Sequence, residues 1–253
     1  MTVVGLASVR SCGVTTTAAG LTMVWPGQGR RVLVEADPAG GTLATVAGLA
    51  AEPGLVSLAA AARRAAEPEL VFEHAQALAD ATPVVCAPPG AEQACSALGM
   101  LGPLFGRLGE LDGLVVADCG RLDRAGPGVR LFEGADLAVL ACRPQLADLN
   151  ALAAFAGGDE QEGRPLVVLV GPGPYPAGEI SETLGIEVAG QLPWDPGAAA
   201  VLGGMAASSR QLTRSPLVRG LRSLADDLGA RVTDVSPLQP AGAQPGALVE
   251  VAP

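Results

Sequence analysis

The fold is decided by the first 24 residues, which read TVVGLA (2–7), SVRSCGVTTT (8–17) and AAGLTMV (18–24). The first segment is apolar and predicts a short buried strand, and the last predicts a helix. Small and hydroxyl-bearing residues lie between them. This order of strand, small-residue loop, threonine pair and helix is the layout of a P-loop, whose backbone amides at a helix N-terminus bind phosphate.

The loop lacks its usual cation. In the motif G-K-[ST] a lysine follows the glycine, but here Val14 follows Gly13. No other lysine can replace it, since all 16 basic residues of the chain are arginine. Backbone amides alone can bind an anion, and the Thr15 hydroxyl could reach Mg²⁺. The candidate phosphate-binding residues are therefore Arg10, Ser11, Cys12, Gly13, Val14, Thr15 and Thr16. An ordinary turn in which Thr15 or Thr16 caps the helix stays open as the alternative.

Composition excludes several classes of protein. The 253 residues are 49% hydrophobic and 17% charged, which indicates a globular chain. The sequence has no uncharged apolar run of about 18 residues, so we expect no membrane span. The N-terminus does not resemble a signal peptide. The net charge of −10 disfavours attraction to DNA or anionic lipid. Five scattered cysteines without a CxxC pair predict reduced thiols, so we expect a cytoplasmic protein.

Short apolar runs alternate with Ala/Leu-rich helical stretches along the chain. This βαβ alternation predicts an α/β fold, a doubly wound, mostly parallel sheet of about seven strands with helices on both faces. We expect one domain over 1–232 and a flexible Pro/Ala/Gly-rich tail over 233–253. The predicted strands are 3–7, 32–35, 84–87, 114–118, 137–142, 166–170 and 187–191. The predicted helices after the first include 55–66, 68–79, 91–108 and 216–228.

Acidic residues follow two of these strands. Glu35 and Asp37 stand in EADPAGG (35–41), and Asp118 closes the apolar run LVVAD (114–118). Ligands bind at the carboxyl ends of parallel strands, so these acids are candidates for Mg²⁺ and for positioning a water. Each also has a simpler interpretation, as an N-capping acid in a turn or a common strand-end aspartate.

In this order and spacing, the three motifs resemble those of the ParA/MinD family, the deviant-Walker P-loop ATPases of the SIMIBI class. The family pattern is KGGxGKTT, then DxDPxG, then an apolar strand ending in Asp. Aligned on Gly13, the signature lysine falls on Val9 and the P-loop lysine on Val14, while Thr15 and Thr16 match the two threonines.

Further segments extend the resemblance over roughly residues 2–228. Glu35 and Asp37 match the acids of the second motif, and Asp118 matches the third. Residues 135–144 resemble the family's fifth-strand region. QLPWD (191–195) resembles its segment near the base, which makes Pro193 and Asp195 candidate base-side residues.

The resemblance implies ATP or ADP with Mg²⁺ held by Thr15, Asp37 and Asp118, and Asp37 as the catalytic residue of an active member. Both family lysines are absent, however, and Arg10 is a bulkier candidate substitute. We therefore expect weak or absent ATP hydrolysis. The loop and the lysine-free composition resemble degenerate actinobacterial proteins of the TadZ/CpaE type, from Tad pilus and secretion clusters. That subtype implies a regulator or scaffold with protein partners, recruited through them to membrane-associated assemblies; a homodimer is left open.

Two alternatives differ in class. One is an active ATPase in DNA partitioning or division-site positioning, with Arg10 as the substitute cation and Asp37 orienting water. The other is a small-molecule enzyme on a related P-loop fold, which no additional acid/base constellation supports. The arginines at 210, 214, 219 and 222 favour a solvated helix face in this acidic chain, so we do not expect non-specific DNA binding.

Overall fold

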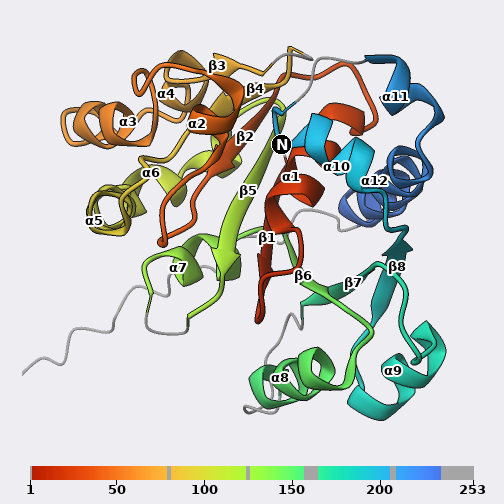
Figure 1. Ribbon diagram of the computed structural model, residues 1–253. Coiled ribbons are helices and arrows are strands. Elements are labelled where there is room, and N and C mark those ends of the chain that lie inside the picture. The colour runs from red at the N-terminus through yellow and green to blue at the C-terminus, as the bar shows by residue number, and fades with distance from the viewer. Residues whose placement is uncertain (1, 79–80, 124–125, 157–164, 206–208, 235–253) are drawn as a thin grey trace, which may run out of the picture.

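A single mixed sheet forms the centre of the molecule (Figure 1). The computed structural model describes residues 2–78, 81–123, 126–156, 165–205 and 209–234. Its eight strands lie in the order β3-β4-β2-β5-β1-β6-β7-β8, and all neighbours are parallel except β3 and β4. The strands are β1 (Thr2–Ser8), β2 (Arg31–Glu35), β3 (Gln76–Ala77), β4 (Pro83–Val85), β5 (Leu114–Arg121), β6 (Leu137–Cys142), β7 (Leu166–Val170) and β8 (Val188–Leu192).

Helices cover both faces of this sheet, as the alternation predicted. Buried residues of α1, α2, α10, α11 and α12 form one apolar layer, and those of α3 to α9 form the other. The helices are α1 (Val14–Val24), α2 (Leu43–Ala47), α3 (Leu55–Ala62), α4 (Leu70–Glu73), α5 (Ala91–Met100), α6 (Gly102–Phe105), the 3₁₀ turn η1 (Leu108–Glu110), α7 (Gly128–Glu133), α8 (Leu146–Ala156), α9 (Ala177–Leu184), α10 (Pro196–Leu202), α11 (Ser209–Arg214) and α12 (Pro216–Asp234).

The doubly wound α/β prediction is confirmed, and all seven predicted strands are present. Their bounds lie within two residues of those expected, except that β5 continues to Arg121, three residues past its predicted end. The eighth strand, β3, lies inside the predicted helix 68–79. That prediction is correct only for α4 and is wrong for the residues that follow it. The Gln76 side chain donates to the carbonyls of Ala50 and Pro53 and accepts from the Ala50 amide. These contacts, together with pairing to β4, hold the segment extended at the sheet edge.

The predicted helix 91–108 is also wrong as one element. α5 ends at Met100, and α6 begins at Gly102 with Pro103 in its first turn. Proline lacks an amide hydrogen and its ring clashes with the preceding turn, so it starts a new helix rather than continuing the old one.

The central strands are buried on both faces, as continuous apolar runs in parallel sheets are. Val4, Leu6, Val115 and Val116 are among their fully buried residues. Among the described helices, none combines the length and apolarity needed to cross a membrane. The predicted tail lies outside the described residues apart from the end of α12 at Asp234, so the domain boundary stays a prediction.

Candidate functional site

The loop after β1 turns into α1 at Gly13. Gly13 precedes α1 in the left-handed region, with φ 90° and ψ 32°, a conformation that favours glycine. The first amides of α1 point out of the helix without intrahelical acceptors. Thr17, in contrast, turns its hydroxyl inward to the Gly13 carbonyl at 2.9 Å. The start of α1 thus presents donors where an anion would bind.

The valines at the two lysine positions have different surroundings. Val14 is 5% exposed and packs in the apolar layer beneath α1 together with Cys12. Val9 is half-buried and lines a cavity beside the loop. Burial raises the pKa of the Cys12 thiol to about 11, although the nearby Arg143 acts in the opposite direction. Cys12 is therefore a protonated packing residue at neutral pH, with no sign of nucleophilic chemistry.

Asp118 lies directly beside the loop, because β5 is the neighbour of β1 and Leu6 pairs with Asp118 in register. Its carboxylate is fully buried, and burial raises its pKa to about 7. The Thr15 hydroxyl and the Gly120 amide, which donates to Oδ1 at 3.0 Å, partly offset that rise. Within the described chain, Oδ2 has no hydrogen-bond partner. A buried carboxylate oxygen without a partner is costly and points to a missing ligand.

Asp37 approaches Asp118 from the adjacent strand. It follows β2, and its carboxylate packs against Gly120, where an added Cβ would overlap it. Its Oδ1 accepts from the Ala39 amide at 2.8 Å. Burial raises the Asp37 pKa, whereas the Ala39 amide and Arg121 lower it. The structure therefore brings Thr15, Asp37 and Asp118 together, as the sequence predicted.

Glu35, the other acid of that motif, has a structural role instead. It is 1% exposed, and its oxygens accept from the backbone amides of Thr42 at 2.7 Å, Leu43 at 3.2 Å and Ala87 at 2.9 Å. The carboxylate thus ties the loop after β2 to the end of β4, although burial raises its pKa.

We expect Glu35→Ala to lower the free energy of unfolding by about 3 kcal/mol, because three backbone amides, two of them buried, lose their acceptor. Urea unfolding at pH 7 measures this. Glu52→Ala, an exposed acid on the next loop, is the matched control and should change stability by less than about 0.5 kcal/mol. An equally small effect at Glu35 would contradict the structural role.

The oxygen donors fit Mg²⁺, provided that a nucleotide supplies the rest of the shell. Mg²⁺ prefers oxygen ligands and is usually held by one or two carboxylates together with substrate phosphates. Thr15 and the unpartnered Asp118 Oδ2 supply such oxygens. Among the described residues there is no cluster of three or more His, Cys, Asp or Glu side chains that could hold a metal alone. The site is therefore suited to a metal–nucleotide complex rather than to a free ion.

Arg10, the candidate substitute cation, forms an ion pair with Asp148 at 3.3 Å. Two arginines that sequence reasoning did not single out lie beside the loop. Arg121 ends β5 and pairs in register with Ser8. Arg143 directly follows β6 and donates to the Ser11 carbonyl at 3.0 Å. The order of strands gives the signal: β5 and β6 flank β1, so residues that end them must lie beside the P-loop.

The predicted base-side residues, Pro193 and Asp195, lie directly after β8. The Asp195 carboxylate caps α10 by accepting from the Ala198 amide at 3.0 Å, and it also accepts from the Ser215 hydroxyl at 2.7 Å. These bonds lower its pKa. Pro193 packs near Gly220 of α12. Trp194, between Pro193 and Asp195, is 65% exposed. This segment therefore contains a carboxylate that is already hydrogen-bonded and an aromatic side chain that is exposed to solvent.

Comparison with solved structures identifies the fold. The ParA family ATPase of Chlorobium tepidum matches with a TM-score of 0.72 at 17% identity, over 90% of this chain and 98% of that one. MinD, the cell division ATPase of Pyrococcus furiosus, matches at 0.69 and 19%, over 91% and 99%. The chain has the ParA/MinD-type fold. MinD of Pyrococcus horikoshii, determined with Mg-ADP, matches at 0.64 and 16%, over 92% and 99%.

The likeness lies in structure rather than in sequence. No family model matches the chain, and no curated protein matches it. The ParA/MinD-type fold is therefore shared over nearly the whole of each compared chain, while both lysine positions hold valine here.

Proposed function

We propose that the protein is a degenerate ParA/MinD-like regulator or scaffold that binds nucleotide and hydrolyses ATP weakly or not at all. Its role would lie in pilus or secretion assembly or in cellular positioning, through protein partners. One observation carries the proposal: the loop, Thr15, Asp37 and Asp118 are held in place, while Val9 and Val14 replace both lysines.

Thr15 and Asp118 would hold Mg²⁺, with Asp37 close enough to act through a water. The bound metal would supply charge neutralisation at the β- and γ-phosphates. The loop amides and the first turn of α1 would bind the phosphates themselves. This division of roles requires no lysine for binding.

Hydrolysis depends more strongly than binding on positive charge beside the phosphates. Positively charged groups at a transferring phosphoryl group contribute several orders of magnitude to its rate. Val14 is packed in the core and Val9 is apolar, so neither replaces that charge. Strong hydrolysis is therefore not expected even if the acids bind Mg²⁺.

Equilibrium binding tests the proposal. We expect ATP and ADP to bind in Mg²⁺, and Thr15→Asn to weaken Mg²⁺-dependent binding at least about tenfold, because a hydroxyl ligand is lost. Isothermal titration with Mg²⁺ or EDTA measures this. Thr45→Asn, the same change at an exposed position of α2, should have no effect. Absence of binding by the wild type at millimolar nucleotide would refute the proposal.

One observation favours the second candidate, an active partitioning or positioning ATPase. Asp37, the acid that would orient water, is retained and held against Gly120 beside Asp118. In that case Asp37→Ala should abolish a substantial steady-state turnover. Under the first proposal the same substitution should leave a turnover that is already near background.

A further inference from the structure

We propose that Arg121 and Arg143 replace the missing lysines as the cations that bind the terminal phosphate of a nucleoside triphosphate. This inference rests on the proposed nucleotide binding and adds the residues that would distinguish ATP from ADP. Neither arginine stands at a lysine position of the family pattern: Arg121 ends β5, and Arg143 directly follows β6.

A cavity beside the P-loop carries the inference. It has a volume of about 400 Å³ and is lined by Val9, Arg10, Ser11, Arg121, Arg143 and Asp148. One wall is thus the loop itself, and the others are the ends of β5 and β6 and the start of α8. Three arginines and one aspartate line it, so the lining has a formal net charge of +2 (three minus one) in a chain whose net charge is −10.

The arginines are not equivalent. Arg10 is partly neutralised by Asp148, which is 14% exposed. Arg143 donates a hydrogen bond from Nη2 to the Ser11 carbonyl. This bond positions the guanidinium group, and because the carbonyl is neutral it does not cancel the arginine's charge. Arg121 lies near enough to Asp37 to lower that carboxyl's pKa. No ion pair of Arg121 or Arg143 within 4 Å occurs in the described part of the chain.

Two further groups make this a site rather than a surface arginine patch. The first turn of α1, an eleven-residue helix, presents amides from the same loop. The buried Asp118 Oδ2 beside Thr15 has no partner within the described chain. The α1 amides, the unpartnered Asp118 oxygen and the guanidinium groups of Arg121 and Arg143 therefore surround one loop, a combination that suits a metal-bound phosphate chain.

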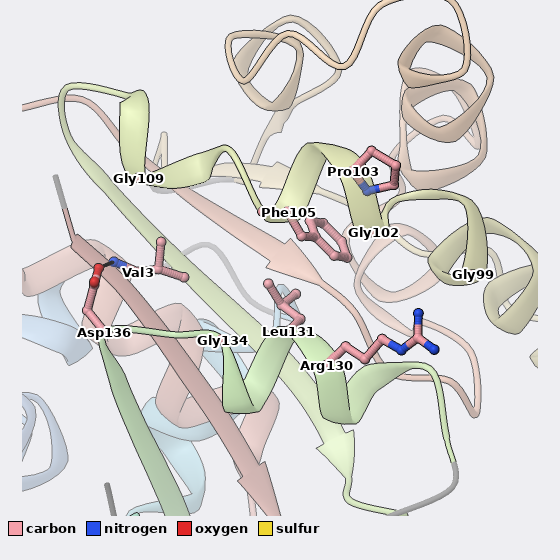
Figure 2. Close-up of a pocket in the computed structure, with 11 residues that line it drawn as sticks. Val3, Gly99, Gly102, Pro103, Phe105, Gly109, Arg130, Leu131, Gly134 and Asp136 are labelled. Carbon is pink, nitrogen blue, oxygen red and sulfur yellow. Dashed lines mark hydrogen bonds between the residues drawn. The ribbon is translucent and has the colours of Figure 1, made fainter. Parts of the chain in front are cut away.

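A larger cavity, shown in Figure 2, lacks this combination. It measures about 570 Å³ between α5, α6 and α7, and its charged lining residues are Arg130 and Asp136. Asp136 there accepts from the Val3 amide at 2.7 Å. One arginine and one engaged carboxylate leave no excess charge, so this cavity offers nothing comparable for an anion.

The guanidinium group suits the proposed role. Its planar fork donates to two phosphate oxygens at once and keeps its charge at any physiological pH. ATP carries one more charged phosphate than ADP, so cations that bind the outermost phosphate should favour ATP selectively. The loop amides, in contrast, would bind the phosphates that both nucleotides share.

The test is the affinity for ATP and for ADP, measured separately in Mg²⁺ by isothermal titration. Arg121→Ala and Arg143→Gln should each weaken ATP binding about tenfold, the loss of one charge-assisted interaction, and ADP binding less than about threefold. Glutamine at 143 removes the positive charge while keeping a polar side chain. Arg222→Ala, an exposed arginine on α12, is the control and should change neither affinity.

The outcomes separate the two proposals. Wild-type binding with unchanged ATP affinity in both variants would overturn this inference and leave the proposed function standing. Equal losses for ATP and ADP would also overturn it, because the arginines would then not act on the terminal phosphate. If the wild type binds neither nucleotide, the proposed function fails first and this inference fails with it. Arg121→Gln, with thermal unfolding of each variant, replaces Arg121→Ala if the latter does not fold.

Discussion

Asp118→Asn should stabilise the nucleotide-free protein at pH 8, by as much as about 4 kcal/mol. The carboxylate is fully buried, and burial raises its pKa from 3.8 to about 7. Above pH 7 the fold must therefore hold a buried charge whose Oδ2 has no partner among the described residues. Asparagine has nearly the same shape and removes that charge. The same variant should lose Mg²⁺-dependent nucleotide binding, so stability would rise as function falls.

The sign of the pH dependence follows from the raised pKa. The folded state binds the Asp118 proton more tightly than the unfolded chain does. The stability from the neutral carboxyl is therefore complete below about pH 4 and is lost as pH rises through about 7.

Urea unfolding of wild type and Asp118→Asn at pH 5 and pH 8 measures this effect. The difference between the two proteins should be larger at pH 8 than at pH 5. Asp112→Asn, at an exposed position just before β5, is the matched control and should show no such gap. A variant that is less stable than wild type at pH 8 would contradict the charge argument.

Val14→Lys should tighten ATP binding by about a hundredfold, since a lysine there would contact two phosphates through charge-assisted bonds. Val14 is 5% exposed, so the lysine must extend its apolar stem along the loop to bring the ammonium into the site. The added volume should cost about 1–3 kcal/mol of stability. Titration calorimetry with ATP and urea unfolding measure the two effects.

Val14→Met is the matched control, because methionine has a comparable unbranched length but no charge. It should share the stability cost and leave ATP affinity unchanged. If lysine and methionine give the same affinity, the missing positive charge at position 14 is not what limits binding.

Much of the fold could be predicted because parallel strands buried on both faces have continuous apolar sequences. Leu114–Asp118 and Leu137–Cys142 are clear examples, and both are strands. The helix 68–79 could not be corrected from sequence, because distant backbone groups at Ala50 and Pro53 bind Gln76 and hold it at the sheet edge. Local propensity contains no information about that contact.

The site residues that follow predicted strands could be predicted from the sequence. Those that the fold brings close from distant parts of the chain could not. Asp37 follows β2 and Asp118 lies near the end of the adjacent strand β5, so the two acids lie close together as expected. The structural role of Glu35 depends on the Ala87 amide, 52 residues away. Arg121 and Arg143 belong to the loop's surroundings only because β5 and β6 flank β1. Side chains from those strands become candidates once the order of the sheet is known.

The most direct test is the fate of a single bound ATP. The purified protein, in molar excess over labelled Mg-ATP, would be sampled over hours and the nucleotide that stays with the protein separated and identified. We predict that it is retained and recovered as ATP, with the same result for Asp37→Ala. Conversion to ADP within seconds by the wild type but not by Asp37→Ala would show a working ATPase and contradict the proposal that the site binds nucleotide without efficient hydrolysis.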